Sequence, residues 1–238
     1  MARALAKSGP VEVHAPNIEE VRIKIKSTAM LVQHKFSSKQ RIQMMANMAT
    51  PKSGKKSKSE RAPRDYDSDF VNAQHKSAEG WNGIPASAFR IAMIDACRTI
   101  GVVMTRTKMA LWILADGSDE ETGMPLVRIH AKKPERTEMP VRNDNGSADI
   151  RVRPMWREWH ATVRVQFDAD MIDMQSVINL LNRAGLQVGV CEGRPFSKNS
   201  AGMGWGTFAV LSIENPKGGE RKPKDATATP PDLAIAAE

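Results

Sequence analysis

The chain has 238 residues, of which 41% are hydrophobic, and this is enough to bury a core in one large domain or two small ones. Its formal net charge of +8 favours an anionic partner, of which nucleic acid is the commonest. Two cysteines without a C-x-x-C motif argue against a disulfide scaffold and a structural zinc site. The sequence has no secretory signal pattern and no apolar run of about 18 residues, so we expect no membrane contact and a cytoplasmic location in a bacterium or an infected bacterial host cell.

The first predicted element is a strand over residues 21–26. Residues 1–17 show no periodicity, and we expect them to form a flexible N-terminal arm. The following sequence VRIKIK alternates apolar and basic residues with a period of two, which predicts a strand with one face on a core. Its other face would carry Arg22, Lys24 and Lys26, either as ordinary solvated charges or as part of a phosphate-binding track.

A basic insertion is expected at about residues 48–80. Its segment TPKSGKKSKS has no apolar residues to bury, so it cannot offset the entropy lost on ordering. We expect a solvated linker that nucleic acid orders through four lysines, Lys52, Lys55, Lys56 and Lys58.

Three aspartates at alternate positions follow, Asp65, Asp67 and Asp69, and they resemble the start of a calcium-binding loop. Phe70 and Lys76 stand where such a loop requires glycine and glutamate, which excludes an EF-hand. A magnesium site built from two of these carboxylates remains an alternative.

A helix is predicted to begin at Pro85, which suits a first helical turn, and to end at Gly101. Apolar residues recur between them at spacings of three and four. Unpaired N–H groups of the first turn would lie beside Ser87 and Arg90, an arrangement that can hold a phosphate.

Two short apolar runs, Met109–Ala115 and Leu126–His130, are predicted to form buried strands. Prolines and an Asn-Gly turn between about 117 and 155 predict a long excursion from the core, which carries Arg151 and Arg153.

Two tryptophans follow these arginines, a mixture that proteins use to bind single strands, because bases stack on aromatic rings while arginines contact the backbone. Clean alternation from Trp159 to Phe167 predicts a strand with Trp159 on its buried face. Trp156 is therefore the candidate for stacking, with a core position as the alternative for both.

A second amphipathic helix is predicted to end at Gly185, before two apolar runs that read as strands, Leu186–Cys191 and Trp205–Leu211. The loop between them could turn its backbone N–H groups toward a phosphate that Arg194 and Lys198 neutralise. The loop glycines of this candidate site are Gly202, Gly204 and Gly206. A mobile hairpin loop, with glycines that serve only its turns, is the alternative.

The order of elements predicts one α+β domain over residues 18–214, with a ferredoxin-like, RNA-recognition-like βαββαβ core. Its long insertions would lie at about 48–80 and 117–155. Residues 215–238 have no core pattern, and we expect a disordered tail.

Two short motifs carry a resemblance to a known family: the segment GIPASAFR at 83–90, which opens a helix, and the glycine-rich loop before the last strand. In both the chain resembles the RAMP superfamily, whose members form the RNA-binding backbone of CRISPR effector complexes. The resemblance covers about residues 81–210 and implies RNA-contacting positions at Pro85, Ser87, Arg90, Gly202, Gly204 and Gly206. The chain is also similar to tailed-phage proteins.

The chain departs from the family pattern in two places: Ala86 stands where the family often has glycine, and the terminal loop is longer and has fewer glycines. No histidine or aspartate is marked as catalytic, so the resemblance implies binding and not cleavage.

Three functions follow from these features. The first is a non-enzymatic single-stranded nucleic-acid-binding protein, RNA favoured, which assembles side by side along its ligand as a homo-oligomer or with other subunits of a ribonucleoprotein. The second is a phage recombination or replication factor that coats single-stranded DNA. The third is a metal-dependent nuclease that uses Asp65, Asp67 or Asp69. The first two are expected to need no metal and no cofactor.

Overall fold

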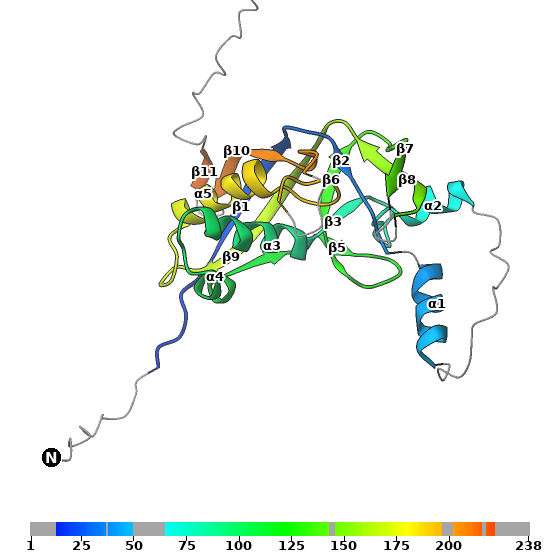
Figure 1. The fold of residues 1–238 in the computed structure, drawn as a ribbon. Helices are drawn as coiled ribbons and strands as arrows, with labels where there is room; N and C mark the ends of the chain where they lie inside the picture. The colour runs from blue at the N-terminus through cyan, green and yellow to red at the C-terminus, as the bar shows by residue number, and fades with distance from the viewer. Residues whose placement is uncertain are drawn as a thin grey trace, which may run out of the picture.

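The computed structural model describes residues 13–36, 38–49, 65–142, 146–196, 202–215 and 218–221. In this part of the chain the protein is an α+β structure with antiparallel sheets (Figure 1). No described helix is long and apolar enough to cross a membrane. Residues 1–12 of the expected arm and most of the expected tail lie outside the described residues, as do five lysines of the predicted site: Lys52, Lys55, Lys56, Lys58 and Lys198.

The main sheet is centred on β1 (Ile18–Ser27), the basic strand predicted from the sequence. It pairs with β10 (Phe208–Asn215) along one edge and with β9 (Trp159–Asp168) along the other. The far edge of β9 pairs with β4 (Leu111–Leu114) and with β6 (Pro125–Ala131). All of these pairs are antiparallel, so β1 and β9 are covered by partners on both edges.

Shorter strands extend this sheet and form a second one. The main sheet is extended by β11 (Gly218–Arg221) beyond β10 and by β3 (Gly83–Pro85) and β5 (Gly117–Ser118) beside β6. The second sheet consists of β2 (Leu31–Val32), β8 (Ala148–Trp156) and β7 (Glu135–Arg142). The expected excursion at 117–155 thus contributes β6 to the main sheet, and the expected tail contributes β11.

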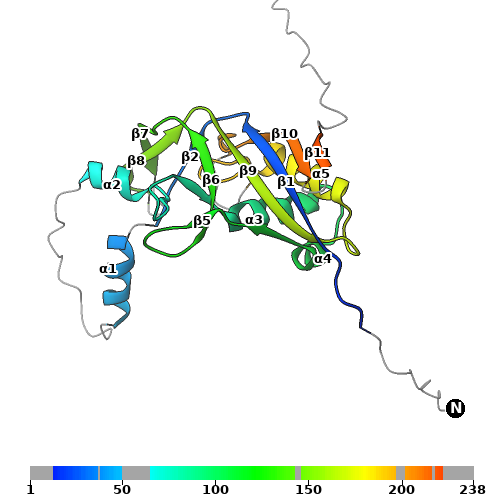
Figure 2. The ribbon, with the colours of Figure 1, turned by 180° about the vertical axis from the view of Figure 1, so that it is seen from behind.

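Helices cover one face of the main sheet. The two longest there are α3 (Ala86–Ala96), which is the helix predicted to begin at Pro85, and α5 (Met174–Arg183). Phe89 of α3 meets Phe208 edge-on, with ring centroids 5.7 Å apart, and buried Val21, Ile23 and Ile25 of β1 belong to the same core. Viewed from behind, the strands lie in front and no described helix covers them (Figure 2).

The remaining helices and helical turns complete the described fold. They are α1 (Ser38–Ala49), α2 (Tyr66–Asn72), the 3₁₀ turn η1 (Cys97–Thr99), α4 (Met104–Ala110) and the π-helical turn η2 (Ala184–Val188). In Figures 1 and 2, α1 lies apart from both sheets, and none of its described side chains is buried.

Three predicted strands are wrong in whole or in part. The strand predicted at Trp205–Leu211 begins only at Phe208. Met109 and Ala110 end α4, and only the residues from Leu111 onward form a strand. Residues 186–191 continue the turn η2 and then a loop, because Gly189 and Cys191 have φ of 72° and 64°, values that lie outside the β region. The glycine-rich loop is therefore flanked by a helix and a strand rather than by two strands.

Candidate nucleic-acid interface

The face of the main sheet opposite the helices is basic along its central strand. Arg22, Lys24 and Lys26 alternate with the buried residues of β1 and point to this face, as the period-two pattern predicted. Lys24 pairs with Glu214 of β10 at 2.6 Å, and Arg22 lies 3.5 Å from Glu20. Lys26 is exposed and forms no ion pair within the described part of the chain.

A row of three side chains crosses the strands at the end of β1. Lys26 lies opposite His160 of β9, and His160 lies opposite His130 of β6. The two imidazole rings are stacked, with centroids 5.0 Å apart and planes 17° from parallel. Since neighbouring strands are about 4.8 Å apart, this row spans roughly 10 Å of exposed sheet.

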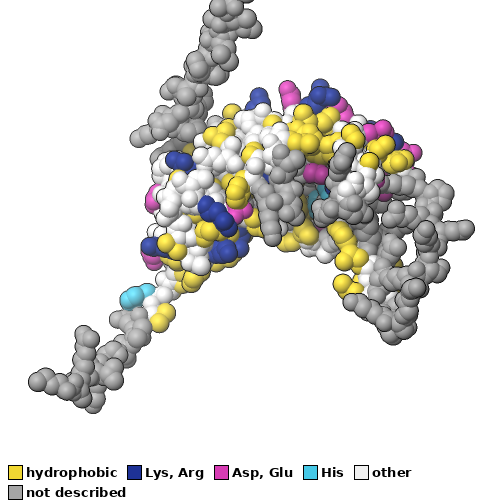
Figure 3. Space-filling view, in the orientation of Figure 1, with side chains coloured by type: hydrophobic (Ala, Val, Ile, Leu, Met, Phe, Trp, Pro, Cys, Tyr) yellow, Lys and Arg dark blue, Asp and Glu magenta, His cyan; other side chains and the backbone are white. Residues whose placement is uncertain are grey.

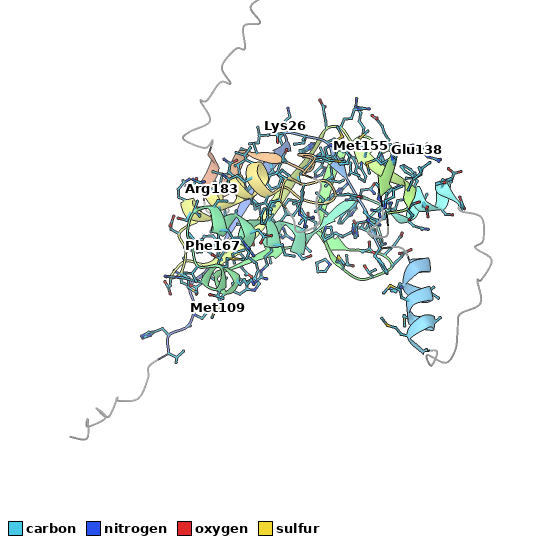
Figure 4. All side chains as sticks on the ribbon, viewed as in Figure 1. Lys26, Met109, Glu138, Met155, Phe167 and Arg183 are labelled. Carbon is cyan, nitrogen blue, oxygen red and sulfur yellow. The ribbon has the colours of Figure 1, made fainter. Side chains whose placement is uncertain are left out.

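A groove of about 850 Å³ runs beside this row. Four basic side chains line it, Lys26, Lys132, Lys133 and Arg157, against two acidic ones, Glu135 and Glu158. Arg157 is paired with Glu135 at 2.9 Å, whereas Lys132 and Lys133 are exposed and have no ion pair among the described residues. Lys26 and Met155, both lining the groove, are labelled close together at the upper edge in Figure 4.

A second, smaller hollow of about 330 Å³ lies at the end of β6, next to the groove. Trp81 is half-buried there, and the guanidinium of Arg128 lies 5.8 Å from the centre of its ring. His130 lines both the hollow and the groove. A band of basic and aromatic side chains therefore extends across the sheet from β1 to Trp81, which precedes β3.

Several residues of the predicted phosphate site meet in a different place, an open cleft of about 600 Å³. Ser87 at the start of α3, Arg151 of β8 and Arg194 of the glycine-rich loop all line it. Sequence reasoning placed the helix start and this loop on one surface, and the structure brings Ser87 and Arg194 to the same cleft. The Arg194 guanidinium donates to the carbonyls of Cys191 and Phe196, so it holds the fold of its own loop.

A buried ion cluster reaches the cleft through His75, which lines it. Lys35 Nζ lies 2.9 Å from Asp119 Oδ1 and 2.9 Å from Glu121 Oε2, and His75 Nδ1 lies 3.4 Å from Asp119 Oδ2. Burial opposes ionisation of Asp119, but hydrogen bonds from Lys35 and Thr122 outweigh it and lower the pKa of this carboxyl to about 2. Burial is also the main cause of the lowered pKa of His75, which outweighs the attraction of Asp119.

Three predicted site residues serve the fold instead. Arg90 donates to the carbonyls of Lys108 and Leu111, which caps the end of α4, and it does not line the cleft. Arg153 is buried and pairs with Glu192 at 2.9 Å. The expectation that Trp156 is the freer tryptophan is wrong, because Trp156 and Trp159 are only 3% and 2% exposed and both belong to the core.

The loop glycines have separate structural roles. Gly202, Gly204 and Gly206 all have positive φ, which is a conformation that only glycine adopts at little cost. A Cβ on Gly206 would lie 1.9 Å from the carbonyl oxygen of Val190, so this position also needs the missing side chain for packing. A Cβ on Gly204 would meet nothing within 4 Å, which leaves its backbone accessible.

Two aspartates of the candidate metal site, Asp65 and Asp67, make structural contacts within the fold. Asp65 caps α2 by accepting from the backbone N–H groups of Asp67 and Ser68, and Asp67 pairs with Arg136 at 2.5 Å. Among the described residues there is no group of three or more His, Cys, Asp or Glu side chains placed to hold a metal ion.

Neither His130 nor His160 was among the residues that the sequence predicted to bind nucleic acid. Alternation in each strand could have placed them opposite the buried residues, because Ile129 and Trp159 precede them on the core side. Their pairing depends on the register between β6 and β9, which the sequence does not specify.

Comparison of the sequence with models of known protein families and with curated protein sequences gives no match. The function must therefore be inferred from the two surfaces. The sheet face presents Lys26, Lys132 and Lys133 without ion pairs among the described residues, whereas Arg194 in the cleft is held by backbone carbonyls. The sheet face is the better candidate for an anionic polymer.

Proposed function

We propose that this protein binds single-stranded nucleic acid, with RNA favoured over DNA, across the open face of its main sheet. The observation that supports this most strongly is a stack of two flat rings beside lysines that have no ion pair among the described residues, on a face that no described helix covers. Phosphates supply most of the affinity of such complexes through basic side chains, and bases stack on flat side chains without regard to sequence. The preference for RNA follows the RAMP resemblance.

We also propose a ferredoxin-like core, related to the RAMP fold. In a βαββαβ core the first strand lies between the third and fourth, and the second pairs with the third. The same order is found along this chain in β1, α3, β4, β9, α5 and β10, and the sheet order β10-β1-β9-β4 agrees with it.

A cytoplasmic location belongs to the same proposal, because the thiols Cys97 and Cys191 are both free, as suits a reducing compartment.

The binding proposal is tested by the salt dependence of affinity for a single-stranded oligonucleotide. Each phosphate contact adds about 0.7 to the slope of log affinity against log salt concentration. The double variant Arg22→Gln/Lys26→Gln should therefore lower the slope by up to about 1.4. Parallel measurements with RNA and DNA of the same sequence would separate an RNA-binding protein from a DNA-coating factor.

A matched control lies on the opposite face. Arg106→Gln/Lys108→Gln removes two exposed charges from α4, on the helix-covered side that Figures 1 and 3 show. Basic side chains occur on that side in scattered groups. Because both double variants remove two positive charges, the control tests whether total charge alone explains binding. An equal loss of slope in both double variants would contradict a site on the sheet face.

Side-by-side assembly along the ligand is the second part of the proposal. Its support is α1, which exposes Ile42, Met45 and Met48 and buries none of its described side chains, as expected of a helix that packs on a partner. Mass photometry with oligonucleotides of increasing length should show stepwise addition of protein copies, which Met45→Glu/Met48→Glu should reduce. Met109→Glu, at a methionine on α4 that is labelled in Figure 4, is the control. Strictly one-to-one complexes on long strands would refute assembly.

A further inference from the structure

The stacked rings of His130 and His160 form a flat aromatic surface on an otherwise charged face. Both residues are exposed, and each lies on the side of its strand that faces away from the core. The ring planes are 17° from parallel, and both rings line the groove. A planar ligand can extend a stack of this kind at little cost in side-chain ordering, because the two rings already hold each other.

Charges around the stack favour an anion. Lys26 lies opposite His160 on β1, Arg128 is two residues from His130 on the same face of β6, and Lys132 and Lys133 follow the end of β6. The acidic groups in the neighbourhood are fewer. They are Asp116, which accepts from the backbone N–H of Arg128, Glu158, and Glu135, which is occupied by Arg157.

The same surroundings favour the neutral form of His130. Partial desolvation is the main cause of its lowered pKa, and the neighbouring His160 and Arg128 lower it further, while Asp116 opposes the shift. A neutral ring stacks on its neighbour without the repulsion that two imidazolium ions would experience.

We propose that His130 and His160 form a stacking site for one nucleobase, with the flanking phosphates held by Lys26 on one side and by Lys132 and Lys133 on the other. This inference rests on the proposed function and adds to it the position and the chemistry of a base-binding site. A ligand that is both planar and anionic is required, and a nucleotide in a single strand meets both requirements.

The test compares a single-stranded oligonucleotide with an abasic strand of the same length, which has the same phosphates but no bases. Wild-type protein should bind the base-bearing strand more tightly. His160→Ala should reduce that affinity by about tenfold and leave the affinity for the abasic strand unchanged, because only stacking is lost. His160→Phe should restore binding, because its ring stacks as well. His34→Ala, which removes an imidazole from the cleft, is the matched control and should bind as wild type.

Ring-proton NMR signals of His130 and His160 give a second measurement on the unmodified protein. They should shift on addition of the base-bearing strand and not on addition of the abasic strand. Equal wild-type affinity for the two strands, or a loss in His34→Ala that is absent in His160→Ala, would overturn the stacking site while leaving nucleic-acid binding intact. Failure of the wild-type protein to bind either strand would overturn the proposed function and this inference together.

Discussion

Removing the charge of Asp119 should destabilise the protein strongly. Asp119 and Lys35 are 0% and 5% exposed at the side chain, and they are 2.9 Å apart. Breaking a buried pair by removing one partner costs about 3–5 kcal/mol, because the other charge stays buried without compensation. Glu121 also lies 2.9 Å from Lys35 and is 38% exposed, so it keeps part of that compensation. We therefore expect Asp119→Asn to lower the free energy of unfolding by about 3 kcal/mol, at the low end of that range.

The pKa of Asp119 gives an independent magnitude. A fall from 3.8 to about 2 corresponds to about 2–3 kcal/mol of preference of the folded state for the ionised carboxylate, since one pKa unit is about 1.4 kcal/mol. The two magnitudes agree to within about 1 kcal/mol.

Urea denaturation followed by tryptophan fluorescence measures this loss at pH 7. Glu120→Gln changes an exposed neighbouring carboxylate and should shift the free energy by no more than about 0.5 kcal/mol. The double variant Lys35→Met/Asp119→Leu should be more stable than Asp119→Asn, because both buried charges of the pair are then removed together. A loss below about 1 kcal/mol in Asp119→Asn would refute this reasoning.

The difference in stability between wild type and Asp119→Asn should depend on pH in a defined direction. Because the pKa of Asp119 is lower in the folded than in the unfolded protein, its contribution is complete above about pH 4 and is lost as the pH falls toward about 2. Wild type and Asp119→Asn should therefore converge in stability across that interval, as acid titration followed by circular dichroism would show. A difference that stays constant down to pH 2 would contradict the assigned pKa.

Three further predictions separate structural from binding roles. Gly204→Ala should lose only the cost of positive φ, about 1 kcal/mol, in thermal melts. Gly206→Ala should lose much more, because only at Gly206 would the added Cβ clash with Val190. Arg90→Met should lower stability by about 2 kcal/mol in urea and leave oligonucleotide affinity unchanged, and a selective loss of affinity would return Arg90 to the binding site. Trp156→Ala should cost about 3–5 kcal/mol in the same assay, as for other buried tryptophans, and a near-neutral result would show that the ring is not in the core.

Local patterns in the sequence predicted the elements whose periodicity is strong. Alternation defined β1 and β9 and placed Arg22, Lys24 and Lys26 on one face, and apolar spacing together with Pro85 defined the start of α3. These predictions succeed because the pleat of a strand and the turn of a helix fix which side chains share a face. Short apolar runs were less reliable. The residues before Leu111 became helical where Arg90 supplies hydrogen bonds to the end of α4, a contact with a residue far away in the chain.

The sequence by itself therefore determined the α+β class and the basic character of the sheet face. Alternation also predicted the burial of Trp159, whereas only the tertiary structure decided which arginines are exposed and that Trp156 is buried. Arg153 and Trp156 are buried by partners that lie far along the chain or on another strand, and no local pattern specifies those partners. Likewise, the register between β6 and β9 brings His130 and His160 into one stack, because strand pairing depends on the packing of the whole sheet rather than on either strand alone.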